Sequence, residues 1–253
     1  MNILVCVKRV PAPGARIVLT DDSQEIDTRH LGFTTSPHEE CAVEAAVQLK
    51  ERHGGTTTVL TLGPPEATEQ LRYSVSVGAD RVVLVPADTT ELDPQATASA
   101  LVEAIKDLEG ESPFDLILFG NESADSGGYQ VGIRVARALG RPVISGLKGI
   151  EIDGDQMVGR RETDEGFEVY RLPMPAIAAA KEGITLPRYP TLPGRLKSRR
   201  AEIHEVPAVM SPGGQEMVSL LKPAEEVTET VILGHGAGAA PGVVRLLEEV
   251  GLL

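Results

Sequence analysis

The sequence predicts an α/β fold: a doubly wound, mainly parallel sheet with a β-hairpin insert and an extended C-terminal arm. Up to about residue 145, short apolar runs alternate with segments of helical periodicity, which is typical of a parallel sheet covered on both faces. After Pro142 the runs are joined by short turns, as in antiparallel hairpins. From about Pro207 there is little periodicity, so this stretch is either disordered or an arm that packs on another subunit.

Four apolar runs in the first half are predicted to be buried strands, because they are short and show no helical period. They are Ile3–Val7, Thr57–Leu62, Arg81–Val85 and Asp115–Phe119. The segments between and after them carry helix start and stop signals, with proline near the start and glycine at the end. The expected helices run from Ser36-Pro37 to Gly54, from Gly63-Pro64-Pro65 to about Val77, from Asp93-Pro94 to about Leu108, and from the loop 120–128 to about Leu139.

The second half is predicted to begin with antiparallel hairpins. Their strands are Leu147–Asp153, Gln156–Thr163 and Phe167–Leu172, joined by an Asp-Gly turn and by Asp164-Glu165-Gly166. An apolar strand, Ala176–Lys181, follows, and then a proline-rich loop over residues 185–194 that has neither a helical nor a strand period. The basic cluster Arg195, Lys197, Arg199 and Arg200 comes next, and a short helix, Val243–Val250, closes the chain.

Composition and charge exclude several classes of protein. The formal net charge is −13, which opposes bulk binding of nucleic acid. Two cysteines, Cys6 and Cys41, form no disulfide framework and suit a reducing compartment. The N-terminal apolar run is followed by charges instead of being preceded by them, unlike a signal peptide, and no run is long enough to cross a membrane. We therefore expect a cytoplasmic protein with no membrane insertion.

Motifs for catalysis and metal binding are missing from the sequence. It contains no P-loop, no HExxH and no GxSxG, and a glycine cluster near residue 236 fails the dinucleotide-binding pattern. The five histidines lie far apart without the spacing of metal ligands. We expect no catalytic residue and no metal site in this chain.

The glycine-rich loop over residues 120–132 is the first candidate binding segment. It follows a predicted buried strand and opens a helix, and open α/β sheets bind ligands at the carboxyl ends of their strands. Adjacent glycines at 127 and 128 let the backbone approach a phosphate, and the first amides of the helix are free to bind an anion. Ser123 and Ser126 add hydroxyl donors. The alternative is an ordinary glycine-rich turn.

Two further segments have both a structural and a functional interpretation. Ser36–Glu39 reads as a helix start with a capping box, and such an N-terminus can also face a nucleotide. Residues 188–193 with the basic cluster after them read either as an edge loop and a solvated helix, or as an exposed apolar knob beside a positive patch that docks partners.

Taken in order, these segments resemble the β subunit of electron-transfer flavoproteins. The resemblance runs from residue 1 to about 204. It rests on Val5-Cys6-Val7-Lys8-Arg9-Val10, the helix from Ser36-Pro37 to Glu51, Gly78-Ala79-Asp80-Arg81, the loop 120–132 and the block Pro187-Arg188-Tyr189-Pro190-Thr191-Leu192-Pro193.

The resemblance implies a sheet of the flavodoxin-like or adenine-nucleotide-binding type. It also implies a heterodimer with a larger α subunit that holds most of the redox FAD. It implies a structural AMP in this chain, or a second FAD in its place in electron-bifurcating members. It divides the chain into a nucleotide-binding domain, 1–205, which includes a partner-recognition loop at about 185–200, and a C-terminal arm, 206–253, that packs on the α subunit.

Site residues follow from the same resemblance. The cofactor-binding positions are Cys6, Ser36, Pro37, His38, Glu39, Leu62, Gly120, Asn121, Glu122, Ser123, Ala124, Asp125, Ser126, Gly127, Gly128, Tyr129, Gln130 and Val131. The partner-docking positions are Leu192 and Lys197.

The implied function is electron carriage, from acyl-CoA or other dehydrogenases to a quinone reductase or a ferredoxin-type acceptor. The flavin supplies this chemistry, so the subunit acts as a carrier without a substrate of its own. Three alternatives remain: an electron-bifurcating β subunit, a stand-alone adenine-nucleotide-binding regulatory protein, and an ATP-using ligase or pyrophosphatase. The position of the serine-glycine run argues against the last.

Overall fold

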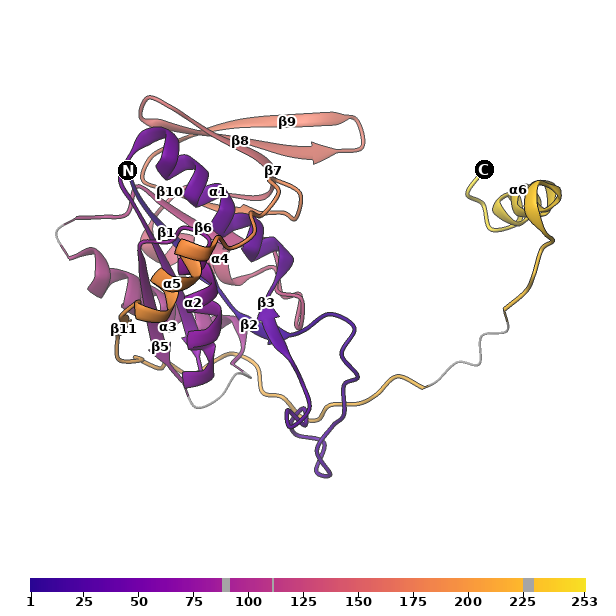
Figure 1. Cartoon of the computed structure of the whole chain (residues 1–253), viewed down its shortest axis with the longest axis horizontal. Coiled ribbons are helices and arrows are strands. Elements are labelled where there is room, and N and C mark those ends of the chain that lie inside the picture. The colour runs from indigo at the N-terminus through magenta and orange to yellow at the C-terminus, as the bar shows by residue number, and fades with distance from the viewer. Residues whose placement is uncertain (88–91, 111, 225–229) are drawn as a thin grey trace. The chain divides into compact units, whose positions relative to one another are not determined.

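A computed structural model describes residues 1–87, 92–110, 112–224 and 230–253 in two compact units, Met1–Val218 and Ser219–Leu253. In the first unit nine strands form one sheet in the order β11-β5-β4-β1-β6-β10-β7-β8-β9 (Figure 1). Their bounds are β1 (Asn2–Val7), β4 (Thr56–Gly63), β5 (Arg81–Pro86), β6 (Leu116–Gly120), β7 (Val143–Asp153), β8 (Gln156–Thr163), β9 (Gly166–Pro173), β10 (Ala176–Ala180) and β11 (Ile203–Glu205). Neighbours from β11 to β7 are parallel, and the β7–β8 and β8–β9 pairs are antiparallel. The predicted fold class and its hairpin insert are confirmed.

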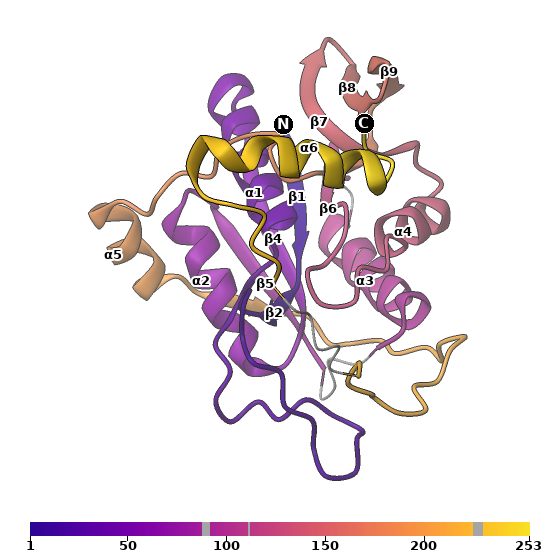
Figure 2. The same ribbon diagram turned by 90° about the vertical axis from the view of Figure 1, so that its right-hand side faces the viewer.

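Helices cover both faces of this sheet. They are α1 (Pro37–His53), α2 (Thr68–Ser76, after the 3-10 turn η1, Pro65–Ala67), α3 (Pro94–Glu109), α4 (Val131–Leu139) and α5 (Leu192–Arg200). One core lies between the sheet and α1 and α2, and a second lies between the sheet and α3 and α4. Figure 2 shows α2 and α3 on opposite sides of the strands.

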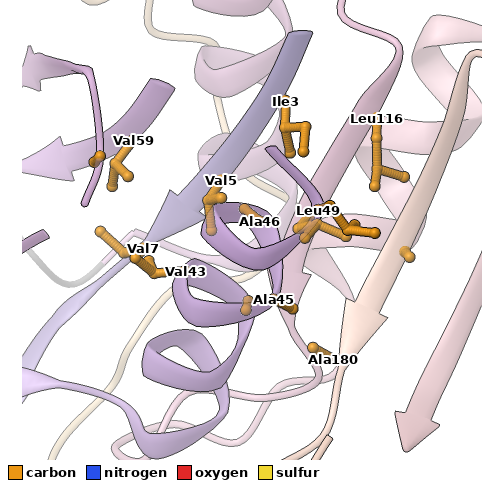
Figure 3. Packing of buried hydrophobic residues seen from close by; sticks show 14 of the residues in the cluster. Ile3, Val5, Val7, Val43, Ala45, Ala46, Leu49, Val59, Leu116 and Ala180 are labelled. Carbon is orange, nitrogen blue, oxygen red and sulfur yellow. The ribbon is translucent and has the colours of Figure 1, made fainter. Parts of the chain in front are cut away.

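The alternation of side chains along β1 explains how a single strand serves both cores. Ile3 and Val5 lie in the core under α1, whereas Leu4 and Cys6 lie in the core under α3 and α4. Figure 3 shows Leu49 and other apolar residues of α1 packed against the first of these faces. Because both faces are buried, the strands are continuous apolar runs, as the sequence pattern indicated.

The strand order reverses at β1. From β1 the chain moves to β4 and then to β5 on one side, and it returns through α3 to β6 on the other side. The first four parallel strands therefore lie in the order 3-2-1-4, as in the dinucleotide-binding doubly wound sheet, whereas flavodoxins have the order 2-1-3-4-5. Ligands of such sheets bind at the carboxyl edge where the order reverses.

Some elements differ from the expectations. Three short strands were not predicted. β2 (Arg9–Pro11) and β3 (Phe33–Thr35) form a separate two-stranded sheet, and β11 lies at the edge of the main sheet. Each has three residues, which are too few to show a period in the sequence. Helix α5 begins at Leu192, inside the expected loop, because the Thr191 side chain accepts a hydrogen bond from the Gly194 amide. Proline at 193 is compatible with this first turn, since its missing N–H would have no partner there.

The second unit contains η2 (Gly236–Ala239) and α6 (Ala240–Glu249), and α6 begins three residues before the predicted helix Val243–Val250. Within this unit, Val243, Val244 and Leu246 of α6 have exposed apolar side chains. Residues 225–229 of the expected arm lie outside the described residues. Across the described ranges, no helix has the length and apolarity needed to cross a membrane.

Candidate nucleotide-binding site

A cavity of about 340 Å³ lies at the carboxyl edge of the sheet, around the ends of β1, β4 and β6. Cys6 ends the buried run of β1, Leu62 comes from β4, and Phe119 and Gly120 come from β6. Residues at the N-termini of α3 and α4 complete the wall. The volume lies within the range of about 300–1,000 Å³ that is usual for small-molecule and cofactor sites.

Ten of the predicted cofactor-binding residues line this cavity. They are Cys6, Leu62, Gly120, Asn121, Ser123, Ser126, Gly128, Tyr129, Gln130 and Val131. The other residues of the loop, Glu122, Ala124, Asp125 and Gly127, belong to the same turn but are absent from the described lining. The structure thus brings the end of β1, the end of β4 and the glycine-rich loop to one cavity.

The glycine-rich loop presents polar groups to the cavity. The hydroxyls of Ser123 and Ser126 lie 3.0 Å apart. Gly127 has φ +55°, and Tyr129 has the same φ. For a residue other than glycine, this left-handed conformation costs about 1–2 kcal/mol. Behind the loop, Asn121 Oδ1 accepts a 2.8 Å hydrogen bond from the Gly146 amide, which ties the loop to β7. These contacts shape the turn that leads into α4.

Ser36–Glu39, at the start of α1, supports the loop from behind and does not contribute to the cavity lining among the described residues. The Ser36 hydroxyl donates to the Glu122 carbonyl at 3.3 Å, and His38 Nε2 lies 3.1 Å from Glu122 Oε1. Pro37 occupies the first turn of α1. The expected cap by Ser36 is therefore wrong, because the side chain makes no capping hydrogen bond and is used to hold the loop.

Glu39 is the most strongly perturbed carboxyl group beside the site. Burial raises its pKa to about 8, although the Lys8 amide donates a 2.8 Å hydrogen bond to its carboxylate. The Lys8 ammonium pairs with Asp125, whose pKa is raised by partial burial but lowered more by Lys8 and by hydrogen bonds from Ser123 and the Ser126 amide. The charges of Lys8 and Asp125 thus compensate each other, and the buried Glu39 is protonated and neutral below about pH 8.

Cys6 lines the cavity as an apolar group. Burial, with a smaller contribution from Glu39, raises the pKa of its thiol well above the ordinary range. A thiol that stays protonated is a poor nucleophile and a poor metal ligand. Its contribution to the site is therefore shape and apolar surface.

Several lining residues were not predicted as site residues. Lys8 and Arg9 follow β1 directly, and basic residues at the end of the first strand were a usable signal. The Arg9 guanidinium lies 3.3 Å from the centre of the Phe33 ring, and its buried Nε has no hydrogen-bond partner among the described residues. Thr97 of α3 and Gln215 of the segment after β11 reach the cavity from elements far along the chain, for which the sequence carried no signal.

The two predicted docking residues lie on α5, away from the cavity lining. Leu192 begins the helix with 73% of its surface exposed. Lys197 Nζ donates to the Ala79 carbonyl at 3.3 Å. The helix is attached to α2 through Arg72, whose guanidinium donates to the Ser198 carbonyl at 2.7 Å.

The loop that precedes α5 is tied to α1 by charge. Arg188 is hydrogen-bonded to both carboxylate oxygens of the buried Glu44, at 2.9 and 3.0 Å, and to Glu51 at 2.6 Å. Leu186 and Tyr189, on either side of this arginine, are almost fully exposed. The loop is therefore held in place while its apolar side chains face outward.

Comparison with known proteins gives a consistent result. A family model described as "Electron transfer flavoprotein domain" matches residues 25–210. The chain is 35% identical to the electron transfer flavoprotein subunit beta of Bacillus subtilis over 208 residues, which cover 81% of this chain and 79% of the relative. It is 33% identical to the subunit of the same name from Mycobacterium leprae over 247 residues, 91% of this chain and 92% of the relative. The match with the Syntrophomonas wolfei subunit is 36% over 204 residues, 80% of this chain and 78% of the relative.

Proposed function

The chain belongs to the electron transfer flavoprotein family, as a β subunit, and from this premise we propose that it binds AMP in the cavity and shares FAD with an α subunit. The resulting heterodimer carries electrons from dehydrogenases, such as acyl-CoA dehydrogenases, to a quinone reductase or a ferredoxin-type acceptor. The observation that carries the proposal is the cavity at the reversal of the strand order, with the glycine-rich loop as one wall.

The size and chemistry of the cavity fit an adenine mononucleotide. At about 340 Å³ the cavity is near the lower end of the usual range for ligand sites, which favours AMP over a second FAD. Apolar atoms of Cys6, Leu62 and Phe119 offer a surface for a flat base. Elsewhere in the lining, the hydroxyls of Ser123 and Ser126 and the backbone amides at the start of α4 offer donors to a phosphate.

The residues of this chain bind and position, and the flavin supplies the chemistry. FAD accepts and donates the electrons when it is bound. We assign the phosphate to the loop from Ser123 to Gln130, and we assign Lys8 to holding that loop through Asp125. Since Cys6 and Glu39 are both protonated at neutral pH, neither acts as a nucleophile or as a base.

Leu192→Ala is expected to weaken electron transfer from a dehydrogenase while leaving the flavin content of the heterodimer unchanged. The side chain is exposed at the start of a helix that is attached to the body, so its loss removes docking surface without opening a core. Exposed apolar anchors of this kind contribute about 1–2 kcal/mol to binding, which corresponds to a five- to thirtyfold rise in KM for the partner. The measurement is the reduction rate of the heterodimer against the concentration of a purified acyl-CoA dehydrogenase.

Val169→Ala is the matched control for this experiment. Val169 has an exposed side chain on β9, at the opposite end of the sheet from β5. Helix α2 packs on β5, and α5 packs on α2. We expect this variant to have the KM of the wild type. Equal KM values for Leu192→Ala and Val169→Ala would contradict the docking role.

The nucleotide content of the purified heterodimer tests the proposed function directly. We expect one FAD and one AMP per heterodimer when the nucleotides are released by heat, separated and counted. Two FAD and no AMP would replace the simple carrier by an electron-bifurcating β subunit. A chain that binds an adenine nucleotide but forms no heterodimer would favour the regulatory protein, and a heterodimer with no flavin would refute electron carriage.

A further inference from the structure

We propose that residues 213–215 form a strap across the rim of the nucleotide cavity, and that Asp93 latches this strap and so slows release of the nucleotide. The inference rests on the proposed function, because it assigns a role to residues beside the same cavity. It adds a retention device built from the segment that follows β11.

One carboxylate joins the strap to the start of α3. Asp93 Oδ1 accepts a 2.7 Å hydrogen bond from the Ala96 amide and thereby caps α3. Asp93 Oδ2 accepts hydrogen bonds from the Gly214 amide at 2.7 Å and from the Gln215 amide at 3.0 Å. The Ala96 amide first, and then the Gly214 and Gln215 amides, lower the pKa of this carboxyl group, so it is ionised at neutral pH.

The strap reaches the cavity at the same place. Gln215 is part of the cavity lining, and so are Pro94 and Thr97 in the first turn of α3. Pro94 also lies beside the glycine-rich loop, because a Cβ on Gly128 would be 3.6 Å from Pro94 Cγ. The latch therefore sits where the strap, the loop and α3 meet.

Glycine at position 213 permits this close approach. A Cβ there would lie 2.3 Å from Asp93 Oδ1 and 2.5 Å from its Cγ, so a side chain could enter only if the carboxylate moved away. Two consecutive glycines, 213 and 214, thus allow the backbone to pass directly over the acid.

Within the described part of the chain, few hydrogen bonds other than those to Asp93 hold residues 207–218. Val209 and Met210 are exposed before the strap. Among the described residues, the only other hydrogen bond from the rest of the first unit to residues 207–218 runs from Gln24 Nε2 to the Val218 carbonyl, at 3.1 Å. Release of the two amides by Asp93 would therefore free residues 213–215, while Ala208 stays packed against the core under α3 and α4.

Asp93→Asn separates the latch from the helix cap. An asparagine Oδ1 can still accept from Ala96, and asparagine is as good an N-cap residue as aspartate. Its amide group, however, cannot accept from Gly214 and Gln215 as Oδ2 does. Two hydrogen bonds to a charged group are lost, and we expect the nucleotide to dissociate at least about tenfold faster.

The experiment measures release of radiolabelled AMP, and in parallel of FAD, from the heterodimer after addition of excess unlabelled nucleotide. Gly213→Ala is expected to accelerate release as Asp93→Asn does, and the double variant should release no faster than either single variant, because both act on one contact. Asp107→Asn is the matched control, since this exposed aspartate lies on α3 and is not part of the cavity lining among the described residues.

Hydrogen exchange distinguishes a latch from a general loss of stability. In Asp93→Asn the Gly214 and Gln215 amides should lose protection while the Ala96 amide keeps it. Release at the wild-type rate in both Asp93→Asn and Gly213→Ala would overturn the strap and leave the proposed function standing. Wild-type heterodimer that retains neither AMP nor FAD at this site would overturn the proposed function, and the strap with it.

Discussion

Replacement of Gly120 by alanine is expected to empty the nucleotide cavity and to lower the free energy of unfolding by about 1–3 kcal/mol. A Cβ at this position would lie 2.6 Å from Glu39 Cγ, 3.1 Å from the Glu39 amide nitrogen and 3.2 Å from His38 Cβ. The start of α1 therefore touches the end of β6, and the new methyl group would push the two apart. Because the glycine-rich loop begins at this point, its turn would move as well.

Gly63→Ala is the matched control for Gly120→Ala. Gly63 ends β4 as Gly120 ends β6, and neither has a positive φ. A Cβ on Gly63 would meet its nearest neighbour, Ala67 Cβ, at 3.7 Å, which is ordinary contact. Bound nucleotide counted after purification, and urea unfolding of both heterodimers, give the comparison. Full nucleotide content in Gly120→Ala would show that the contact with α1 does not shape the site.

In the wild type, we expect Glu39 to make the free energy of unfolding decrease as the pH rises from about 4.5 to 8, and Glu39→Gln should abolish this decrease. In the folded chain burial raises the pKa of Glu39 to about 8, whereas in the unfolded chain this group ionises near its ordinary value of 4.5. Between these values the folded state binds the extra proton, so the free energy of unfolding decreases with rising pH, by at most about 1.4 kcal/mol per pH unit. Glutamine does not titrate, and its oxygen can still accept from the Lys8 amide.

The measurement is urea unfolding of the wild-type and Glu39→Gln heterodimers at equal concentration from pH 5 to pH 9.5. The variant should gain stability relative to the wild type as the pH rises, and the difference should level off above about pH 8. Glu202→Gln, at an exposed position, should give a curve parallel to that of the wild type. A parallel curve for Glu39→Gln would mean that Glu39 is ionised in the folded chain at neutral pH.

Local patterns were sufficient for most elements and for part of the site. The continuous apolar runs predicted β1, β4, β5, β6 and β10, because buried parallel strands need apolar side chains on both faces. The loop after β6 was identified by its glycines and by its place before a helix, and it lines the cavity. Its ends are close in the sequence, so no long-range contact was needed to place it.

Contacts between distant segments could not be predicted in this way. Lys8 pairs with Asp125, and Glu182 donates its amide to His38, because β1, β6 and β10 are neighbours in the sheet. The hydroxyl of Ser36 was expected to cap its own helix, but it donates a hydrogen bond to the Glu122 carbonyl of the glycine-rich loop instead. In each case a partner more than 80 residues away decides the role of the side chain.

The fold class, the hairpin insert and the glycine-rich loop could be predicted from the residues alone, because each depends on residues that are close together in the chain. The resemblance to electron-transfer flavoproteins rests on short motifs of the same kind. The 3-2-1-4 strand order, the cavity at its reversal and the contact of Asp93 with Gly214 and Gln215 could be seen only in the folded chain. Strand order and loop contacts depend on which buried surfaces and which unpaired amides fit together in space, and a local pattern of residues does not specify that choice.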